Sequence, residues 1–129
     1  MSSPAQPRLA QLRRALNAFA RERLEDYPDL YLAVQRWRYR GQPIAQHIVD
    51  AGTDIVIDGF PRSANSFSVR AFLSAQPAPL RVGHHMHSHA QIVKSVRLGL
   101  PTILLIRNPD DCIVSLRAMD VQLAKRGGK

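Results

Sequence analysis

The sequence has a single cysteine, few aromatic residues and no long apolar run. Cys112 has no second cysteine to pair with, which excludes an internal disulfide, a CxxC redox pair and a cysteine-based zinc cluster. No segment approaches the roughly 18 consecutive apolar residues of a membrane-spanning helix. The start, MSSPAQPRLAQLRR, lacks the apolar stretch and small-residue cleavage site of a signal peptide. We therefore expect a cytoplasmic chain without a transmembrane segment.

Acidic residues are also scarce. The chain has 129 residues, of which 45% are hydrophobic and 22% charged, and this composition is typical of one modest globular domain. There are 18 Lys and Arg but only 10 Asp and Glu, and 18 minus 10 gives a net charge of +8 with histidine neutral. Such an excess indicates an anionic partner: nucleic acid, acidic lipid or a phosphate-bearing small molecule.

The amino-terminal segment 7–40 is expected to form a helical extension. Apolar residues recur there at helical spacing, with arginines on the other faces: Leu9, Leu12, Leu16 and Phe19. Pro28 interrupts this pattern, and residues 29–40 favour a second helix that stops at Gly41. We expect the amphipathic first helix to pack against a sheet rather than to lie on a membrane.

Short apolar runs alternate with helix signals along the rest of the chain. The predicted strands are residues 54–58, 81–83 and 101–106, and the predicted helices are residues 67–73, 88–98 and 108 onward. Ser88 and Gln91 form a capping box, and Asn108 before Pro109 marks a helix start that carries Cys112 and Ile113 toward the core. The run 101–106 is continuously apolar, as expected of a parallel strand covered on both faces.

This order predicts an α/β fold, a parallel sheet with flanking helices. We interpret residues 1–129 as a single domain with a nucleotide-binding core at 54–118. Only two or three strands are visible, fewer than a parallel sheet normally has, and no strand follows the last helix. We therefore expect an incomplete sheet, in a chain that is the amino-terminal part of a larger domain.

Polar residues follow two of the predicted strands, where ligands of open α/β sheets bind. The loop 59–66 offers successive backbone amides, hydroxyl and amide side chains, and the charge of Arg62. After the last strand, Arg107 and Ser115 are placed to converge on another anion. Two anion sites on adjacent strands imply a nucleotide that carries phosphates at both ends of its ribose.

Both stretches resemble motifs of sulfotransferases that use PAPS, 3′-phosphoadenosine-5′-phosphosulfate. P-R-S-A-N-S-F at residues 61–67 is similar to the family's 5′-phosphosulfate loop, P-[KR]-S-G-[TN]-[TS]-[WF]. R-N-P-D-D-C-I-V-S at 107–115 is similar to its R-[DN]-P-x-[DE]-x-x-x-S stretch, and H-M-H at 85–87 lies where the family has K-T-H. The resemblance, over residues 54–118, implies a P-loop nucleotide-hydrolase-like fold and a PAPS-dependent sulfotransferase.

The resemblance also implies a role for each matching residue. Arg62 neutralises charge on the transferred sulfuryl group, and His87 is the general base, with His85 as the alternative. The remaining donor contacts divide between the two motifs: Ser63, Ala64, Asn65 and Ser66 at the 5′-phosphate, Phe67 against the adenine, and Arg107 and Ser115 at the 3′-phosphate. The acceptor is an unknown small molecule or carbohydrate with a hydroxyl or amine. Ala64 replaces the family's glycine, which costs on the order of 1 kcal/mol if the position needs a positive φ.

Other functions remain open. I-D-G-F-P-R-S at residues 57–63 is close to the D-G-F-P-R-T stretch of adenylate kinases, but residues 1–58 contain no G-x-x-x-x-G-K-[ST] loop. A basic fragment that binds nucleotide or nucleic acid without catalysis also fits the charge. With only eight aromatic residues, none of them interleaved with a basic strand, we expect no nucleic-acid partner.

A structural role is the alternative for several of these side chains. Arg107 can pair with Asp110 or Asp111. The histidines at 84, 85, 87 and 89 invite interpretation as a zinc site, but no acidic residue or cysteine accompanies them locally. We therefore expect no metal.

Overall fold

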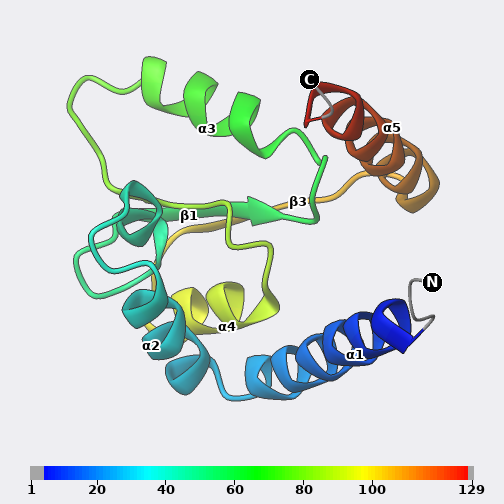
Figure 1. Cartoon of the computed structure of the whole chain (residues 1–129). Coiled ribbons are helices and arrows are strands. Elements are labelled where there is room, and N and C mark those ends of the chain that lie inside the picture. The colour runs from blue at the N-terminus through cyan, green and yellow to red at the C-terminus, as the bar shows by residue number, and fades with distance from the viewer. Residues whose placement is uncertain (1–4, 128–129) are drawn as a thin grey trace.

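A computed structural model describes residues 5–127 (Figure 1). Its elements follow one another as α1 (Ala5–Glu25), α2 (Pro28–Arg38), the 3-10 helix η1 (Pro43–His47), β1 (Ile55–Gly59), α3 (Asn65–Ser74), β2 (Val82–Gly83), α4 (His89–Arg97), β3 (Thr102–Leu105) and α5 (Pro109–Gly127). The predicted alternation of strands and helices is confirmed. Helix α3 begins two residues earlier than predicted, at the carboxyl end of the loop that follows β1.

The described strands form a parallel sheet in the order β2-β1-β3. Val56 of β1 pairs with Gly83 of β2 and with Thr102 of β3. Helix α3 lies on one face of this sheet and α4 with α2 on the other (Figure 1). The coarse prediction of an α/β fold with a parallel sheet and flanking helices is confirmed.

Alternating side chains of β1 divide the core into two layers. Val56 faces α2 and α4 and belongs to a cluster with Tyr31 and Ile48. Ile55 and Ile57 point the opposite way and pack with α3 and β2. Because successive side chains of a strand point to opposite faces, one short strand supports both layers. Every residue of β1 is buried, so the loop after it is anchored at its start.

The last strand differs from the prediction. Residues 101–106 were expected to be covered on both faces, but Ile103, Leu104 and Ile106 are exposed. β3 pairs only with β1 among the described strands, and its far edge is open. Its continuous apolar run therefore reflects surface that residues 5–127 leave uncovered, rather than a buried central strand.

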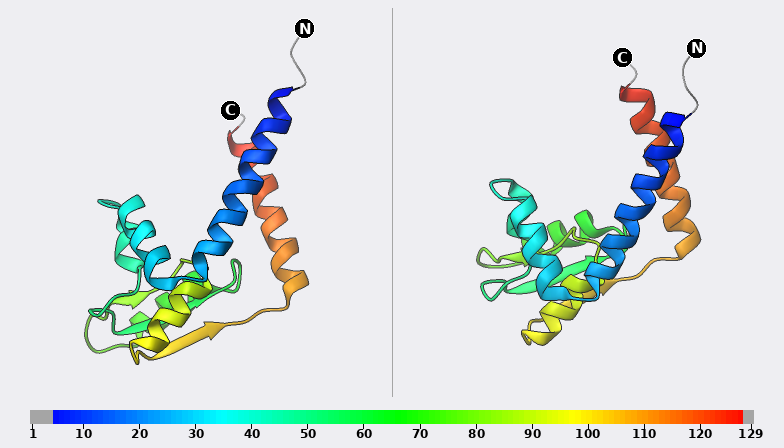
Figure 2. Two further views of the ribbon diagram at one scale, coloured as in Figure 1. Left: turned by 90° about the horizontal axis from the view of Figure 1, so that it is seen from below. Right: turned by 60° about the horizontal axis from the view of Figure 1, so that its bottom comes forward.

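Helix α1 also departs from expectation. Leu12, Leu16 and Phe19 are 58%, 59% and 58% exposed, so these residues of the apolar stripe do not pack against the sheet, and the side chain of Leu9 lies outside the described part of the chain. The helix extends beyond the sheet, and so does α5 (Figure 2). On α5, Cys112 is buried as predicted, but Ile113 is exposed. No helix in the described part of the chain has both the length and the apolar character needed to cross a bilayer.

The helix ends that flank the site follow the sequence signals closely. Asn108 caps α5, because its Oδ1 accepts a hydrogen bond from the amide of Asp110 at 2.9 Å. Ser88 caps α4 by accepting from the amide of Ala90 at 3.2 Å. Gly99, with φ +68°, follows the end of α4 as a left-handed stop. The capping box is only half formed, because the side chain of Gln91 turns into the core instead of returning to Ser88.

Candidate functional site

The loop after β1 has a backbone shaped to present amide groups. Arg62 and Ala64 have φ of 71° and 62°, the left-handed region that residues with a Cβ avoid. The amides of residues 64–67 donate no hydrogen bond to another described residue. Left-handed residues alternating with ordinary ones are typical of anion-binding loops, and this loop ends at the start of α3. The strain foreseen at Ala64 is therefore present.

The structure joins the two sequence motifs directly. The Nε of Arg62 donates a hydrogen bond to Ser115 Oγ at 2.8 Å. The Nη1 of Arg107 donates to the main-chain carbonyl of Arg62 at 3.0 Å. No ion pair joins Arg107 to Asp110 or Asp111 among residues 5–127, where all three side chains are described. Arg107 and Ser115, which lie 45 and 53 positions after Arg62 in the sequence, thus hold the loop from the side of α5.

Arg62 and Arg107 both line one cavity of about 580 Å³. The loop residues 61, 62 and 64–67 line it, together with His85, His87 and Arg107, and Leu116 and Met119 close it from α5. Among the described residues that line it, none is acidic. An open cavity with two fixed positive charges and unpaired amides favours an anionic ligand.

Four of the predicted donor contacts have other partners in this structure: the side chains of Ser63, Asn65, Ser66, which bonds His85, and Ser115. The hydroxyl of Ser63 is buried and faces Cys112, with Oγ and Sγ 3.6 Å apart. The Nδ2 of Asn65 donates to the carbonyl of Phe60 at 3.0 Å, so this side chain closes the loop on itself. Ser115 is occupied by Arg62. These side chains therefore hold the loop in shape, and the main-chain amides of residues 64–67 are the groups left without a partner among the described residues.

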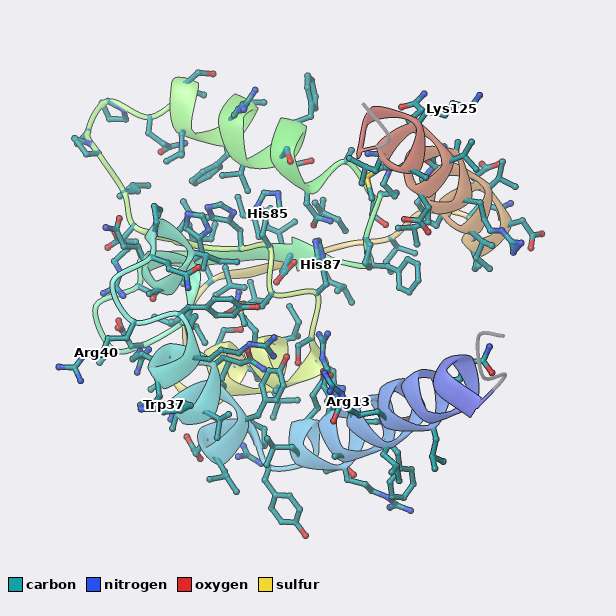
Figure 3. All side chains as sticks on the ribbon, in the orientation of Figure 1. Arg13, Trp37, Arg40, His85, His87 and Lys125 are labelled. Atoms are coloured by element: carbon teal, nitrogen blue, oxygen red, sulfur yellow. The ribbon has the colours of Figure 1, made fainter. Side chains whose placement is uncertain are left out.

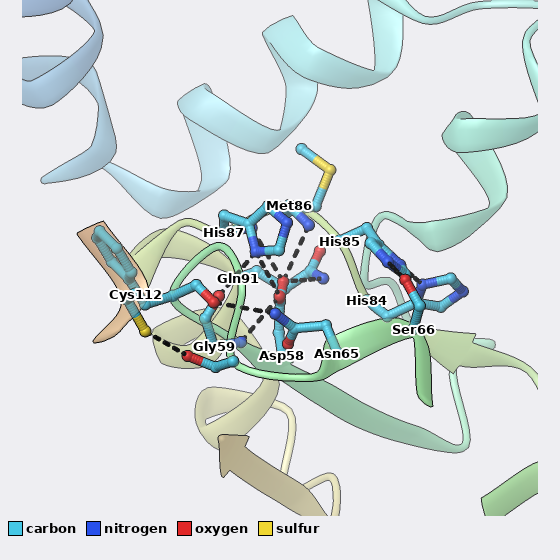
Figure 4. A network of polar contacts seen from close by, with 12 residues as sticks. Asp58, Gly59, Asn65, Ser66, His84, His85, Met86, His87, Gln91 and Cys112 are labelled. Carbon is cyan, nitrogen blue, oxygen red and sulfur yellow. Dashed lines mark hydrogen bonds and ion pairs between the residues drawn. The ribbon is translucent and has the colours of Figure 1, made fainter. Parts of the chain in front are cut away.

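Asp58, at the end of β1, organises the other side of the cavity (Figure 4). Its carboxylate is 1% exposed. Oδ2 accepts from the amides of Met86 and His87 and from Nε2 of Gln91, at 3.0, 3.2 and 3.2 Å, and Oδ1 accepts from the amide of Gly59 at 2.9 Å. A buried carboxylate with four N–H donors is fully satisfied, so it pins residues 86–87 against the strand end.

The same contacts set the proton positions of His87. Its Nδ1 lies 2.7 Å from the carbonyl of Gly59, which can only accept, so Nδ1 carries the proton. In the neutral ring Nε2 is then the unprotonated nitrogen. Asp58 Oδ1 lies 3.5 Å from Nδ1, close enough to stabilise the ring once it is charged. In this tautomer, Nε2 of His87 is the ring nitrogen that can accept a proton.

His85 is engaged differently. Its Nε2 is 2.8 Å from Ser66 Oγ, and its Nδ1 meets Nδ1 of His84. Burial, with the neighbouring charges of His87 and His47, lowers its pKa despite the opposing effect of Asp58. Both ring nitrogens have partners, whereas no described residue bonds Nε2 of His87. Of the two histidines, His87 is therefore the one with a ring nitrogen left free to exchange a proton with a ligand.

Two polar residues that hold the site were not singled out from the sequence. Asp58 was assigned only to a strand, although an acid within the apolar run I-V-I-D-G is itself a signal, because a buried charge needs partners. Gln91 was assigned to a helix cap, but it is buried and bridges the amide of Val49 to Asp58. A third missed residue, His47, lies against the histidine cluster.

Comparison with known proteins adds no assignment to this geometry, since no family model, curated protein or solved structure matches the chain.

Proposed function

We propose that this chain carries the donor-binding half of a PAPS-dependent sulfotransferase site on a P-loop-type sheet. The observation that carries the proposal is the shared cavity of Arg62 and Arg107, with unpaired amides between them. The two motifs were matched to the family separately. Their meeting in one place is what a single bridging donor requires.

The donor would lie with its two phosphate groups at opposite sides of this cavity. The amides at the start of α3, with Ser66 and Arg62, are suited to the 5′-phosphosulfate. Arg107 is suited to the 3′-phosphate. Phe67 is exposed and lines the cavity, in reach of an adenine ring. Because Arg62 keeps its proton throughout, its part is to offset charge on the sulfuryl group and to orient it.

His87 would take the acceptor's proton. As the acceptor oxygen or nitrogen attacks sulfur, the new bond to sulfur forms and the bond from sulfur to the bridging oxygen of the phosphosulfate breaks. The acceptor proton passes to Nε2 of His87, and PAP, the 3′,5′-bisphosphate, leaves with the electron pair. The fixed Nδ1 proton and the nearby Asp58 carboxylate favour this role, because they orient the ring and stabilise its charged form.

A second cavity offers space for the acceptor. It has a volume of about 280 Å³ and is lined by His87 and by apolar residues that include Phe60, Ile92 and Leu104. His87 lies on both cavities, one cationic and the other mainly apolar. An acceptor in the second cavity would therefore lie next to His87, the residue that the two cavities share.

Calorimetric titration with PAP tests the proposal. The wild type should bind PAP, and Arg62→Ala and Arg107→Ala should each weaken binding about 10- to 100-fold, the worth of a charge-assisted hydrogen bond. Arg40→Ala is the matched control, because it removes the same charge from an exposed position outside the cavity (Figure 3). Equal affinity in all four proteins would refute the proposal. Salt-sensitive binding of RNA without binding of PAP would favour a basic nucleic-acid-binding surface instead.

A further inference from the structure

Three histidines converge at the end of the edge strand β2, and one of them, His85, also lines the donor cavity. His47 ends η1, and His84 and His85 follow β2. Their rings bring one nitrogen each within 4.8 Å of the others. The rings of His47 and His84 are stacked with centroids 3.8 Å apart, and the Nδ1 atoms of His84 and His85 face each other.

The cluster leaves hydrogen-bonding capacity unused. Nδ1 of His47 is buried and has no partner among the described residues. Buried polar atoms in folded proteins nearly always have a partner, so such an atom needs an explanation. The facing nitrogens of His84 and His85 can share one proton at most. A cation between the rings would satisfy these nitrogen lone pairs together.

The outer nitrogen of His85 has the partner that metal-bound imidazoles commonly have. Its Nε2 lies 2.8 Å from Ser66 Oγ. In metal sites the ring nitrogen that does not bind the ion usually donates to an oxygen, which fixes the tautomer and the ring orientation. With Nε2 protonated toward Ser66, Nδ1 of His85 presents its lone pair to the other two rings.

We propose that His47, His84 and His85 form a three-imidazole site for a divalent transition-metal ion, with Zn²⁺ as the best fit. Imidazole nitrogen suits zinc, copper, nickel and iron, and three protein ligands leave one position of tetrahedral zinc open to water or another ligand. This differs from the expectation drawn from the sequence, which weighed the histidines at 84, 85, 87 and 89 without His47. The argument for this site does not rest on the proposed sulfuryl transfer, although His85 also lines the donor cavity.

The electrostatics of the cluster are compatible with metal ligands. Burial lowers the pKa of His47, and burial together with His47 and His85 lowers that of His84 to about 4. Neutral imidazole is the form that binds metal. Through its hydrogen bond with His85, Ser66 links the three-histidine cluster to the loop at the start of α3.

Equilibrium dialysis of the metal-free full chain against Zn²⁺, with elemental analysis, tests the site. The wild type should take up one equivalent, and His47→Gln and His84→Gln should weaken binding about 100-fold each. His89→Gln is the matched control, because His89 is exposed and lies outside the cluster, beside Glu25 and Asp26. This variant should bind zinc like the wild type.

Several results would overturn the proposal. They are absence of stoichiometric zinc in the wild type, wild-type affinity for zinc in the variants at 47 and 84, or loss of zinc in His89→Gln. If a variant fails to fold, the wild type alone decides. Its Co²⁺ complex should show the visible absorption of a four- or five-coordinate nitrogen site, and a spectrum identical to that of aqueous Co²⁺ would contradict the assignment.

Discussion

Replacing Asp58 by asparagine tests whether this buried carboxylate holds the site together. The substitution keeps the size of the side chain and removes its charge. In the wild type, Oδ2 accepts hydrogen bonds from three N–H groups, in residues 86, 87 and 91, and Oδ1 accepts one from the amide of Gly59. Asparagine has one oxygen and one NH₂ group. If the oxygen takes the three-donor position, the NH₂ group faces the Gly59 amide.

The expected loss of stability follows from these contacts. An orphaned buried amide costs about 1–3 kcal/mol, and each of three charge-assisted bonds that become neutral loses about 1 kcal/mol. Relief from the cost of burying a charge offsets part of this sum. We expect the free energy of unfolding to fall by about 2–4 kcal/mol, a large share of the stability of a small domain.

Urea unfolding of the wild type and of Asp58→Asn measures this difference. Asp120→Asn is the control, because it makes the same chemical change at an exposed position of α5 with no hydrogen bond among the described residues. The control should unfold at the wild-type midpoint. If Asp58→Asn did so as well, the network would not be holding residues 86–87, and the orientation inferred for His87 would lose its support.

Three further predictions concern the strand end, an ion pair and the base. Gly59→Ala should unfold at a much lower urea concentration than the wild type, because a Cβ there would lie 2.2 Å from a carbonyl oxygen of β3. Ala64→Gly should be neutral or stabilising by up to about 1 kcal/mol, since φ at that position is positive. The opposite order of the two unfolding midpoints would contradict this backbone geometry. Burial raises the pKa of Asp50, but hydrogen bonds from Arg81 and a backbone amide outweigh it and hold the pKa below 3.8. The pair therefore stabilises the fold above that pH and loses its effect as pH falls through the depressed pKa. The free energy of unfolding of Arg81→Gln, measured in urea, should be about 0.2–1 kcal/mol lower than that of the wild type at pH 7, with a smaller difference at pH 3. A larger difference at pH 3 would contradict the lowered pKa of Asp50. His87→Gln should keep the calorimetric affinity for PAP and lose sulfuryl transfer, and unchanged transfer would assign the base elsewhere.

Local signals in the sequence predicted most of the elements, because those signals act over a few residues. Asn108 and Gly99 mark helix boundaries through their own side chain or backbone, and β1 is a short β-branched run. The position of Arg62 and Arg107 beside one cavity was also predictable, since the carboxyl ends of parallel strands share one edge.

What could not be predicted depends on contacts between distant segments. Gln91 has the spacing of a capping residue, yet a buried carboxylate 33 positions away binds its side chain. His47 lies far from the other histidines in sequence, and only the turn after η1 brings it to them. The exposure of Leu12 and Leu16 likewise depends on which surfaces the rest of the chain supplies, information that periodicity does not contain.

The central claim is that two cationic sites bind opposite ends of one nucleotide. Calorimetry of Arg107→Ala with PAP and with AMP, which lacks the 3′-phosphate, tests it most directly. We predict that this substitution weakens PAP binding about 10- to 100-fold more than it weakens AMP binding, while Arg62→Ala weakens both. An equal loss for PAP and AMP in Arg107→Ala would contradict the claim, because Arg107 would then be supporting the loop rather than binding a second phosphate.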